Sequence, residues 1–510
     1  MNFDTKNDRL GFCETILDCI AEQSVDADIS LPDYCSDIKR ILRCSTVAAV
    51  NSVSVAQGRV TCDASAVIKI IYVDSEDKIN AYEQECPFQK YIENSAVDES
   101  CAVGVKIKTD YVNSRAISPR RINIHASLAC SFRADKRRTE NILSFAQGEG
   151  VQCRCKKSKT VDVVGKAVRV FPMSEVVELP SDKYCVSKIL NVHAVARGDD
   201  VKVITNKMLV KGMLDIQIYY LSESFTVERY EHNMPISQIL EMEGLSEECI
   251  NRLDLTVAGA EVLPKVDSSG EMKLLDIMVN IQAKLSACRK AEITLVDDAY
   301  STCRELKCET KSIELCEPVD SYGETFLSKT TVDSSLSQPD AILAVWCTSP
   351  VYNSNLKEGF CVTSGSYECC VIYRDTQGEY GFVSKQIDFE HRHPVSGSVM
   401  RIRTNTCVKI INCSCAVTAD SRLEIKTEML IDADIYSLKI EKYVSSVEVG
   451  EVSQNKRAAA LTVYFSDAEE SVWNIAKRYN TTVKAVMEEN ALESENIPCS
   501  KMLLIPVVDA

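Results

Sequence analysis

An alternation of apolar and polar positions recurs three times along the chain. From Val60 to Tyr72 every second residue is apolar or small, and the same alternation runs from Met208 to Tyr220 and, with one threonine, from Cys361 to Tyr373. Because successive side chains of a β-strand point to opposite faces, each run predicts a long strand with one face in a core. A shorter alternating run precedes each long strand, beginning at Leu42, Leu190 and Leu343.

The three runs belong to one repeat of about 150 residues. Ile41–Tyr72 falls without a gap on Ile189–Tyr220 at an offset of 148, and on Ile342–Tyr373 a further 153 along. A repeat of this length predicts three domains of one kind rather than a short-period solenoid. The third position of each long strand is small, so we expect a bend or bulge there: Ala64, Gly212 and Gly365.

These patterns predict a mainly β protein of three antiparallel sandwich-like or barrel-like domains, followed by a small α+β tail. Copy two alone carries a helical spacing, from Ile239 to Leu253, that predicts a helical insert. The basic run Lys156–Lys159 is interpreted as a solvated linker face rather than a binding patch. The expected divisions are an N-terminal lead-in (1–24, helix or strand), repeats at 25–150, 171–302 and 318–446, a linker (447–460) and a tail domain (461–506).

Charge and hydropathy narrow the possible functions. The chain has 510 residues and a formal net charge of −16, which argues against a general nucleic-acid binder, since phosphate contacts need clustered Lys and Arg. The N-terminal residues contain Asp and Lys where a signal peptide needs an apolar run. No stretch reaches about 18 apolar residues. We therefore expect no membrane insertion and a cytoplasmic location.

The 24 cysteines are expected to be reduced thiols, buried as small hydrophobes in place of Val, Met or Ile. There is no C-x-x-C pair, and the nearest patterns are Cys153–Cys155, Cys413–Cys415 and Cys369–Cys370. His391 and His393 share one face of an extended segment, but two ligands are too few for a metal site. No catalytic motif is present. The sequence predicts no metal, no cofactor and no enzymatic activity.

The tail predicts the order strand–helix–helix–strand. Leu461–Tyr464 forms a short strand, Val472–Tyr479 has helical spacing, Thr481 or Thr482 caps a second helix that ends at Asn490, and Leu503–Pro506 forms the last strand. This tail resembles the LysM domain, a small glycan-binding module. The resemblance covers its opening strand, both helices and the closing Leu-Leu-Ile-Pro.

The tail departs from the LysM pattern where that family has its sugar groove. The family's Gly-Asp-Thr turn is Glu469-Glu470-Ser471 here, and its Gly-Gln turn is Ser500-Lys501. Glycine lets a backbone approach a ligand closely, so bulky residues in these turns are expected to weaken glycan binding. The resemblance implies a partner-binding surface made of the LysM loops and the first helix, namely Glu469, Glu470, Ser471, Trp473, Ile497, Pro498, Ser500 and Lys501. Trp473 is expected to be either a core residue or a direct contact.

The repeats resemble the SPOCS domain in two places. Ile29–Asp33 with Asp37-Ile38 is similar to its opening, and Arg121–Ile124 is similar to a later strand. SPOCS repeats with a LysM tail resemble the SipL-like family of clostridial spore coat assembly proteins, over about residues 25–506. This resemblance implies a scaffold in the mother-cell cytosol at the forespore surface, which tethers the coat by binding a coat scaffold ATPase through its LysM tail. The alternative is a peptidoglycan-binding protein of the cortex or wall, with affinity for N-acetylglucosamine glycans.

Overall fold

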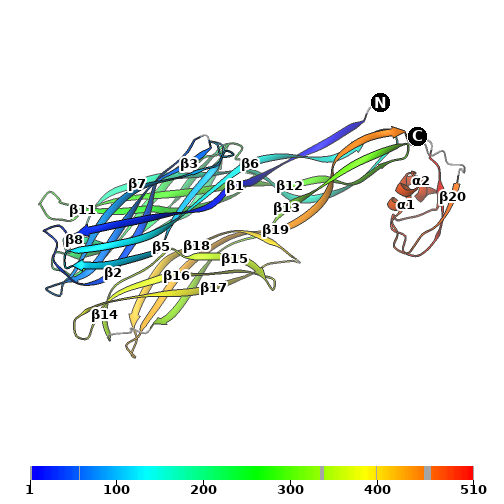
Figure 1. Ribbon diagram of the computed structural model, residues 1–510. Helices are drawn as coiled ribbons and strands as arrows, with labels where there is room; N and C mark the ends of the chain where they lie inside the picture. Colours follow the sequence, from blue (N-terminus) through cyan, green and yellow to red (C-terminus); the bar gives the residue numbers. More distant parts are fainter. Residues whose placement is uncertain (1–2, 57, 333–337, 398, 453–460, 509–510) are drawn as a thin grey trace.

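The computed structural model describes residues 3–508, except 57, 333–337, 398 and 453–460. Strands dominate the three repeats, and the two helices of the described residues lie in the tail (Figure 1). Repeat 1 comprises β1 (Asp4–Ser30), β2 (Ile38–Ala56), β3 (Arg59–Asp74), β4 (Ile79–Glu93), β5 (Ala102–Ser118) and β6 (Arg121–Gln147). Repeat 2 comprises β7 (Val151–Glu178), β8 (Val186–Ile204), β9 (Lys207–Ser222), β10 (Val227–Glu241), β11 (Ile250–Lys265) and β12 (Leu274–Ser301). Repeat 3 comprises β13 (Arg304–Val332), β14 (Pro339–Cys347), β15 (Val351–Lys357), β16 (Phe360–Asp375), β17 (Tyr380–Pro394), β18 (Ile402–Val417) and β19 (Leu423–Val452).

Each repeat is a sandwich of two antiparallel sheets, so the mainly β fold predicted from the sequence is confirmed. In repeat 1 the sheets have the orders β1-β6-β5 and β2-β3-β4, and repeat 2 reproduces them as β7-β12-β11 and β8-β9-β10. In repeat 3 they are β13-β19-β18 and a sheet in which β16 pairs with β14, β15 and β17. The predicted long strands are β3, β9 and β16, each the centre of its sheet, where an alternating apolar face meets the facing sheet.

The small position of each long strand lies opposite an irregularity in its neighbour. In repeats 1 and 2 the pairing shifts by one residue in β2 and β8, opposite Ala64 and Gly212. In repeat 3 the neighbouring strand is interrupted between β14 and β15, and Gly365 pairs with Tyr352 of β15. A Cβ atom at Gly212 would overlap the carbonyl oxygen of Arg197. A small residue is therefore needed because the neighbouring backbone comes too close for a larger one.

The first and last strands of each repeat continue beyond the sandwich as two-stranded ribbons. The pairs β1–β6, β7–β12 and β13–β19 wrap around one another into a stalk (Figure 1). The stalk has two successive apolar layers, and each ribbon contributes one residue to the first layer and the adjacent residue to the second. The two layers contain Ile142, Leu295 and Tyr443, then Leu143, Val296 and Val444. A bulge follows each pair, which shifts the alternation and lets two adjacent residues both be buried.

The three repeats also meet at the end of the sandwiches away from the stalk. The sheets that contain β3, β9 and β16 share an apolar cluster. This cluster includes Leu42, Leu190 and Leu343 at equivalent positions. Trp346 is only 7% exposed in this cluster, and its ring lies 6.4 Å from that of Tyr219 in repeat 2. A neighbouring domain therefore covers this tryptophan. Two shared cores, one at each end, join three equivalent sandwiches into one elongated body.

The structure differs from the expected domain boundaries. β1 runs unbroken from Asp4 to Ser30 and pairs with β6, so the expected lead-in (1–24) is part of repeat 1. The segments expected between repeats, 151–170 and 303–317, belong almost entirely to β7 and β13, whose first halves form the stalk. Lys156 and Lys157 lie in β7 rather than in a linker, and Lys156 Nζ is 2.6 Å from Glu441 Oε2. Of the linker expected at 447–460, residues 447–452 belong to β19, and the rest lies outside the described residues.

The helical insert predicted in copy two is wrong. β10 continues to Glu241, a turn follows in which Gly244 has a φ of +79°, and β11 starts at Ile250. The apolar residues that suggested a helix alternate as a strand requires, since Ile239 is 62% exposed and Leu240 is 4% exposed. Pairing of β10 with β9 therefore overrides the helical spacing.

The tail has the predicted order of elements: β20 (Leu461–Phe465), α1 (Val472–Arg478), α2 (Val483–Glu489) and β21 (Met502–Pro506). β20 and β21 pair antiparallel, and both helices pack on one face of this sheet, as in a LysM domain. Thr482 accepts a hydrogen bond from the Ala485 amide at 3.1 Å, which caps α2. Among the described residues, no helix is long and apolar enough to span a membrane.

Candidate partner-binding surface of the C-terminal module

The two LysM loops that depart from the family pattern lie side by side. The Glu469 amide donates to the Ile497 carbonyl at 2.7 Å, and the Ile497 amide donates to the Glu470 carbonyl at 3.2 Å. Ser471 forms a β-bridge with Asn496 in the same region. In these loops, four of the residues expected at the surface are exposed: Glu469, Pro498, Ser500 and Lys501. We call these four residues the loop face.

Glu469 keeps the backbone shape of the glycine that it replaces. Its φ is +64°, in the left-handed region that favours glycine, and an L-residue there costs about 1–2 kcal/mol. The turn therefore has a glycine-like backbone and an exposed carboxylate. The Glu470 side chain, unlike that of Glu469, is engaged within the module. It accepts a hydrogen bond from the Tyr464 hydroxyl at 3.0 Å and pairs with Arg478 at 3.7 Å.

Two residues expected at the surface are buried. Ile497 is 2% exposed and belongs to the core of the module. Trp473 is 5% exposed, because α1 faces the end of the stalk. As direct contacts for an external partner these two assignments are corrected, since neither side chain is accessible in this arrangement.

Trp473 docks the LysM module onto repeat 2. Its indole packs edge to face on Tyr300 of β12, with ring centroids 5.0 Å apart, and Arg154 of β7 lies over it at 5.2 Å. The Trp473 Nε1 donates to Asp298 Oδ2 at 2.9 Å, and Lys477 Nζ donates to the same carboxylate at 2.7 Å. Tyr300 in turn donates its hydroxyl to the Thr481 carbonyl at 2.8 Å. Aromatic packing and charge thus hold one helix of the module to the stalk.

The Asp298 carboxyl is held ionised at this contact. Burial alone would raise its pKa, but the hydrogen bonds from Lys477 and Trp473 outweigh burial, and the pKa of Asp298 is lowered. The sequence analysis did not predict that Asp298 and Tyr300 contact the tail. The available signal was that repeat 2 alone has Asp298 and Tyr300 at these stalk positions, where repeat 1 has Phe145 and Gln147.

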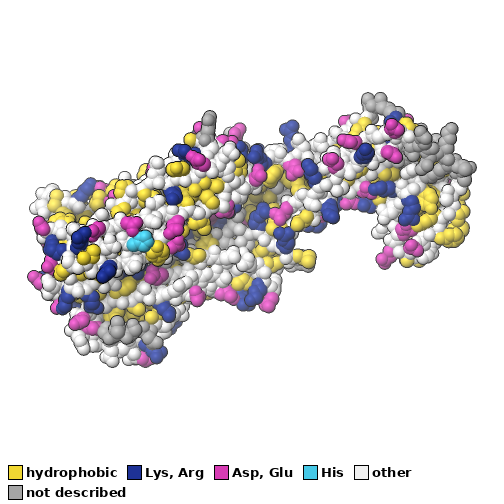
Figure 2. Space-filling view, viewed as in Figure 1, with side chains coloured by type: hydrophobic (Ala, Val, Ile, Leu, Met, Phe, Trp, Pro, Cys, Tyr) yellow, Lys and Arg dark blue, Asp and Glu magenta, His cyan; other side chains and the backbone are white. Residues whose placement is uncertain are grey.

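The module also exposes apolar side chains on its sheet. Leu461, Val463 and Phe465 alternate along β20 with exposures of 43%, 53% and 73%, and Met502 of β21 is 55% exposed. Phe465 pairs with Met502, so these four residues form a continuous apolar strip. Figure 2 shows hydrophobic side chains gathered over β20. The helices cover the other face of the sheet, so the apolar strip faces away from the docking helix. Contiguous exposed apolar surface is typical of protein-binding sites.

The two histidines considered as metal ligands are engaged with carboxylates of β13. His391 Nε2 lies 2.9 Å from Glu324 Oε2, and His393 Nδ1 lies 2.8 Å from Glu324 Oε1. The other ring nitrogen of His393 is 3.1 Å from Asp320, and its hydrogen bond is the main cause of a lowered pKa of Asp320. His393 thus bridges Asp320 and Glu324 and links β17 to β13.

Family models match parts of the first two repeats and the tail. The family model of the SPOCS domain of SipL matches residues 37–117 and 185–263, within repeats 1 and 2, and the LysM domain model matches residues 468–506. No curated protein and no solved structure matches the chain. The matched SPOCS and LysM domains are non-catalytic binding domains, and they indicate a sporulation-associated protein with a module of the glycan-binding LysM class. Its arrangement of SPOCS domains followed by a LysM domain is the SipL-like architecture.

Proposed function

We propose that this protein is a non-enzymatic scaffold of spore coat assembly, which tethers coat protein around the forespore by protein–protein binding through its LysM module. The three sandwiches and the stalk provide a long rigid body with a shared core at each end. The LysM module sits at the far end of that body (Figure 1). This arrangement suits a protein that holds two layers at a distance.

The apolar strip is the observation that carries the proposal. Glycan recognition combines hydrogen-bonding side chains with stacked aromatic rings, whereas the apolar strip has one aromatic ring, Phe465, beside aliphatic side chains and no hydrogen-bonding side chain. Such a surface fits the apolar patch of another protein. The carboxylate of Glu469 on the loop face adds a second obstacle to a flat glycan.

The resemblance to SipL-like proteins supports the finer parts of the proposal. It suggests a coat scaffold ATPase as the partner and the mother-cell cytosol, at the forespore surface, as the location. The match to the SPOCS and LysM families is the support for both.

Peptidoglycan binding remains a second candidate, because the LysM model matches the module that contains the loop face. The two candidates use different surfaces of one module. Protein binding requires the apolar strip, and glycan binding requires the groove beside Glu469 and Ser500.

The two surfaces can be separated by variants of the full-length chain. The double variant Phe465→Ser, Met502→Ser removes the cross-strand pair at one end of the apolar strip, and Ile20→Ser, at a residue of β1 that is 71% exposed, serves as the control. Each protein is tested for capture of the purified coat ATPase and for retention on cortex peptidoglycan. We expect the double variant alone to lose ATPase capture. Undiminished capture by the double variant, or peptidoglycan retention without ATPase capture by the unmodified chain, would overturn the proposal.

A further inference from the structure

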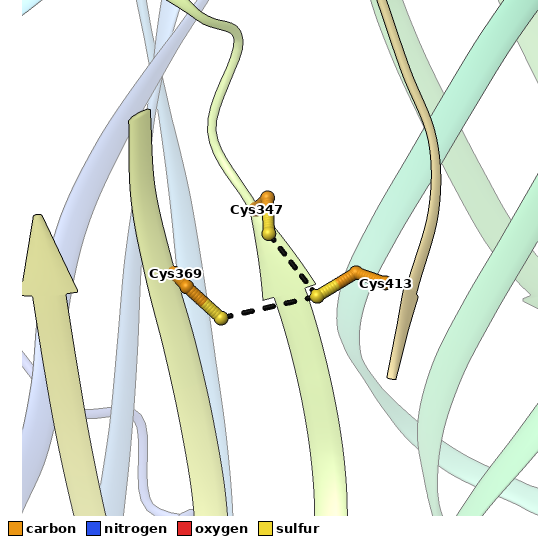
Figure 3. A group of neighbouring side chains, drawn as sticks. All are labelled: Cys347, Cys369 and Cys413. Carbon is orange, nitrogen blue, oxygen red and sulfur yellow. Dashed lines mark hydrogen bonds between the residues drawn. The ribbon is translucent and has the colours of Figure 1, made fainter. Parts of the chain in front are cut away.

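Three cysteines from three strands converge in the core of repeat 3. Cys347 of β14 and Cys369 of β16 are paired neighbours in one sheet, and Cys413 of β18 faces them from the other sheet (Figure 3). The Cys413 sulfur lies 3.2 Å from that of Cys347 and 3.9 Å from that of Cys369. All three sulfurs lie within 4.8 Å of one another. The three side chains are buried, with exposures of 5%, 0% and 8%.

The other two repeats provide an internal comparison. Strand pairing aligns the three cysteines with core positions of repeats 1 and 2 that contain no sulfur. These positions hold Thr46, Ile68 and Val112 in repeat 1, and Ala194, Ile216 and Ala260 in repeat 2. The fold therefore does not require cysteine at any of the three positions, and the cluster is specific to repeat 3.

Two buried hydroxyl groups adjoin the cysteines, again in repeat 3 alone. The Thr427 hydroxyl is 3.9 Å from the Cys413 sulfur. The Tyr367 hydroxyl is buried and has no partner at hydrogen-bonding geometry among the described residues. The equivalent residues are apolar, Ala126 and Ala66 in repeat 1 and Val279 and Leu214 in repeat 2.

The geometry of the sulfurs fits a thiophilic cation. Cysteine thiolates bind such ions at metal–sulfur distances of about 2.3 Å. A trigonal or tetrahedral arrangement then places the sulfurs roughly 3.8–4.0 Å apart. The Cys369–Cys413 separation of 3.9 Å matches this range, and the Cys347–Cys413 separation of 3.2 Å has to lengthen slightly when a cation binds. Thiolates bound to a metal accept hydrogen bonds from surrounding donors, which is the role that the Thr427 hydroxyl, 3.9 Å from the Cys413 sulfur, is placed to fill.

We propose that Cys347, Cys369 and Cys413 form a binding site for one thiophilic d10 cation. The cluster supplies three sulfur donors among the described residues. Structural Zn²⁺ usually takes four protein ligands, whereas Cu⁺ is satisfied by few soft sulfur ligands. Cu⁺ is therefore the expected cation, and Zn²⁺ is the second ion to test.

Binding requires the thiols to lose their protons. Capture of one cation by three thiols releases up to three protons, and occupancy rises with pH. Because the site is buried on all sides, the cation enters while repeat 3 folds.

The test is refolding of the full-length chain without oxygen, in the presence of Cu⁺ or, separately, Zn²⁺, followed by gel filtration and metal analysis. The variant Cys347→Ala, Cys413→Ala introduces the residues of repeat 2 at these positions, Ala194 and Ala260. The matched control Cys62→Val, Cys130→Ala likewise introduces Val210 and Ala283 into the core of repeat 1. Circular dichroism establishes that each protein is folded.

We expect the unmodified chain and the control to retain one cation per chain, and the Cys347, Cys413 variant to retain none. The two metal arms identify the ion. Absence of retained metal in both arms, or equal retention by the two double variants, would overturn the proposal. If the Cys347, Cys413 variant does not fold, Cys369→Ala replaces it. The metal retained per chain is then compared with that of the control in the same way.

Discussion

Trp473 of the LysM module and Tyr300 of the stalk pack edge to face, with ring centroids 5.0 Å apart at an interplanar angle of 74°. The contact joins the C-terminal module to repeat 2, although more than 170 residues separate the two side chains in the chain. It directs α1 towards the stalk and leaves the apolar strip, on the other side of the module, free to meet a partner. A tryptophan expected either to fill the core or to contact a partner thus sets the orientation of the apolar strip.

Loss of Tyr300 should release the module. In a Trp346→Phe background Trp473 is the only tryptophan of the chain, so its fluorescence reports the contact. Tyr300→Ala removes the aromatic packing and the hydrogen bond to Thr481, and we expect a red shift of Trp473 emission as the indole meets water. Tyr184→Ala, at a tyrosine of repeat 2 that is 58% exposed, is the control. An unchanged spectrum in Tyr300→Ala would show that the contact does not persist in solution.

Acid should release the same contact. The folded pKa of Asp298 is lowered, so its stabilisation is complete above the ordinary aspartate pKa of about 3.9 and is lost as pH falls through the lower folded value. In the single-tryptophan background, emission should shift to the red below about pH 4. Asp298→Asn should show part of this shift already at neutral pH and little further change. Asp199→Asn, at an exposed residue of β8, should titrate as the unmodified chain does.

The strength of sequence reasoning on this chain lay in periodicity. Apolar residues at every second position predict β3, β9 and β16, and helical spacing in the tail predicts α1 and α2. Each of these elements has one face against a core. The stalk escaped prediction because its contacts join the three repeats, and because bulges place adjacent residues such as Leu295 and Val296 both inside. The cysteine cluster escaped for a related reason. Its members are distant in sequence, and no short spacing marks them.

The stalk core should contribute strongly to stability. Leu295 is fully buried between the ribbons of all three repeats, so Leu295→Ala should reduce the free energy of unfolding by about 2–5 kcal/mol. Val176→Ala, at a residue of β7 that is 55% exposed, should have little effect. Denaturant unfolding of both variants provides the measurement. Equal midpoints for the two would mean that the ribbons do not pack together in solution.

The small positions of the long strands should be intolerant of even one methyl group. A Cβ atom at Gly212 or Gly365 would overlap a carbonyl oxygen of the neighbouring strand, that of Arg197 or Val351. Gly212→Ala and Gly365→Ala should therefore each destabilise the protein by about 1–3 kcal/mol, because the strands must move apart. At Gly104 of β5 a Cβ atom would meet nothing within 4 Å, and Gly104→Ala should be neutral. Thermal unfolding of the three variants compares them directly, and a neutral Gly212→Ala would refute the close approach.

Restoring the two family glycines should strengthen glycan binding by the loop face. Glu469 already has a φ of +64°, so Glu469→Gly keeps the backbone shape, removes the exposed carboxylate and relieves about 1–2 kcal/mol of left-handed strain. Ser500→Gly reopens the second turn. The double variant should be retained on cortex peptidoglycan more strongly than the unmodified chain, while capture of the coat ATPase through the apolar strip stays unchanged. Glu493→Gly, at an exposed residue outside both loops, is the control for removal of one acidic side chain.

Equal peptidoglycan retention by the double variant and the unmodified chain would show that side chains in these turns do not limit glycan binding. A simultaneous loss of ATPase capture would show instead that the loop face, and not the apolar strip alone, meets the protein partner.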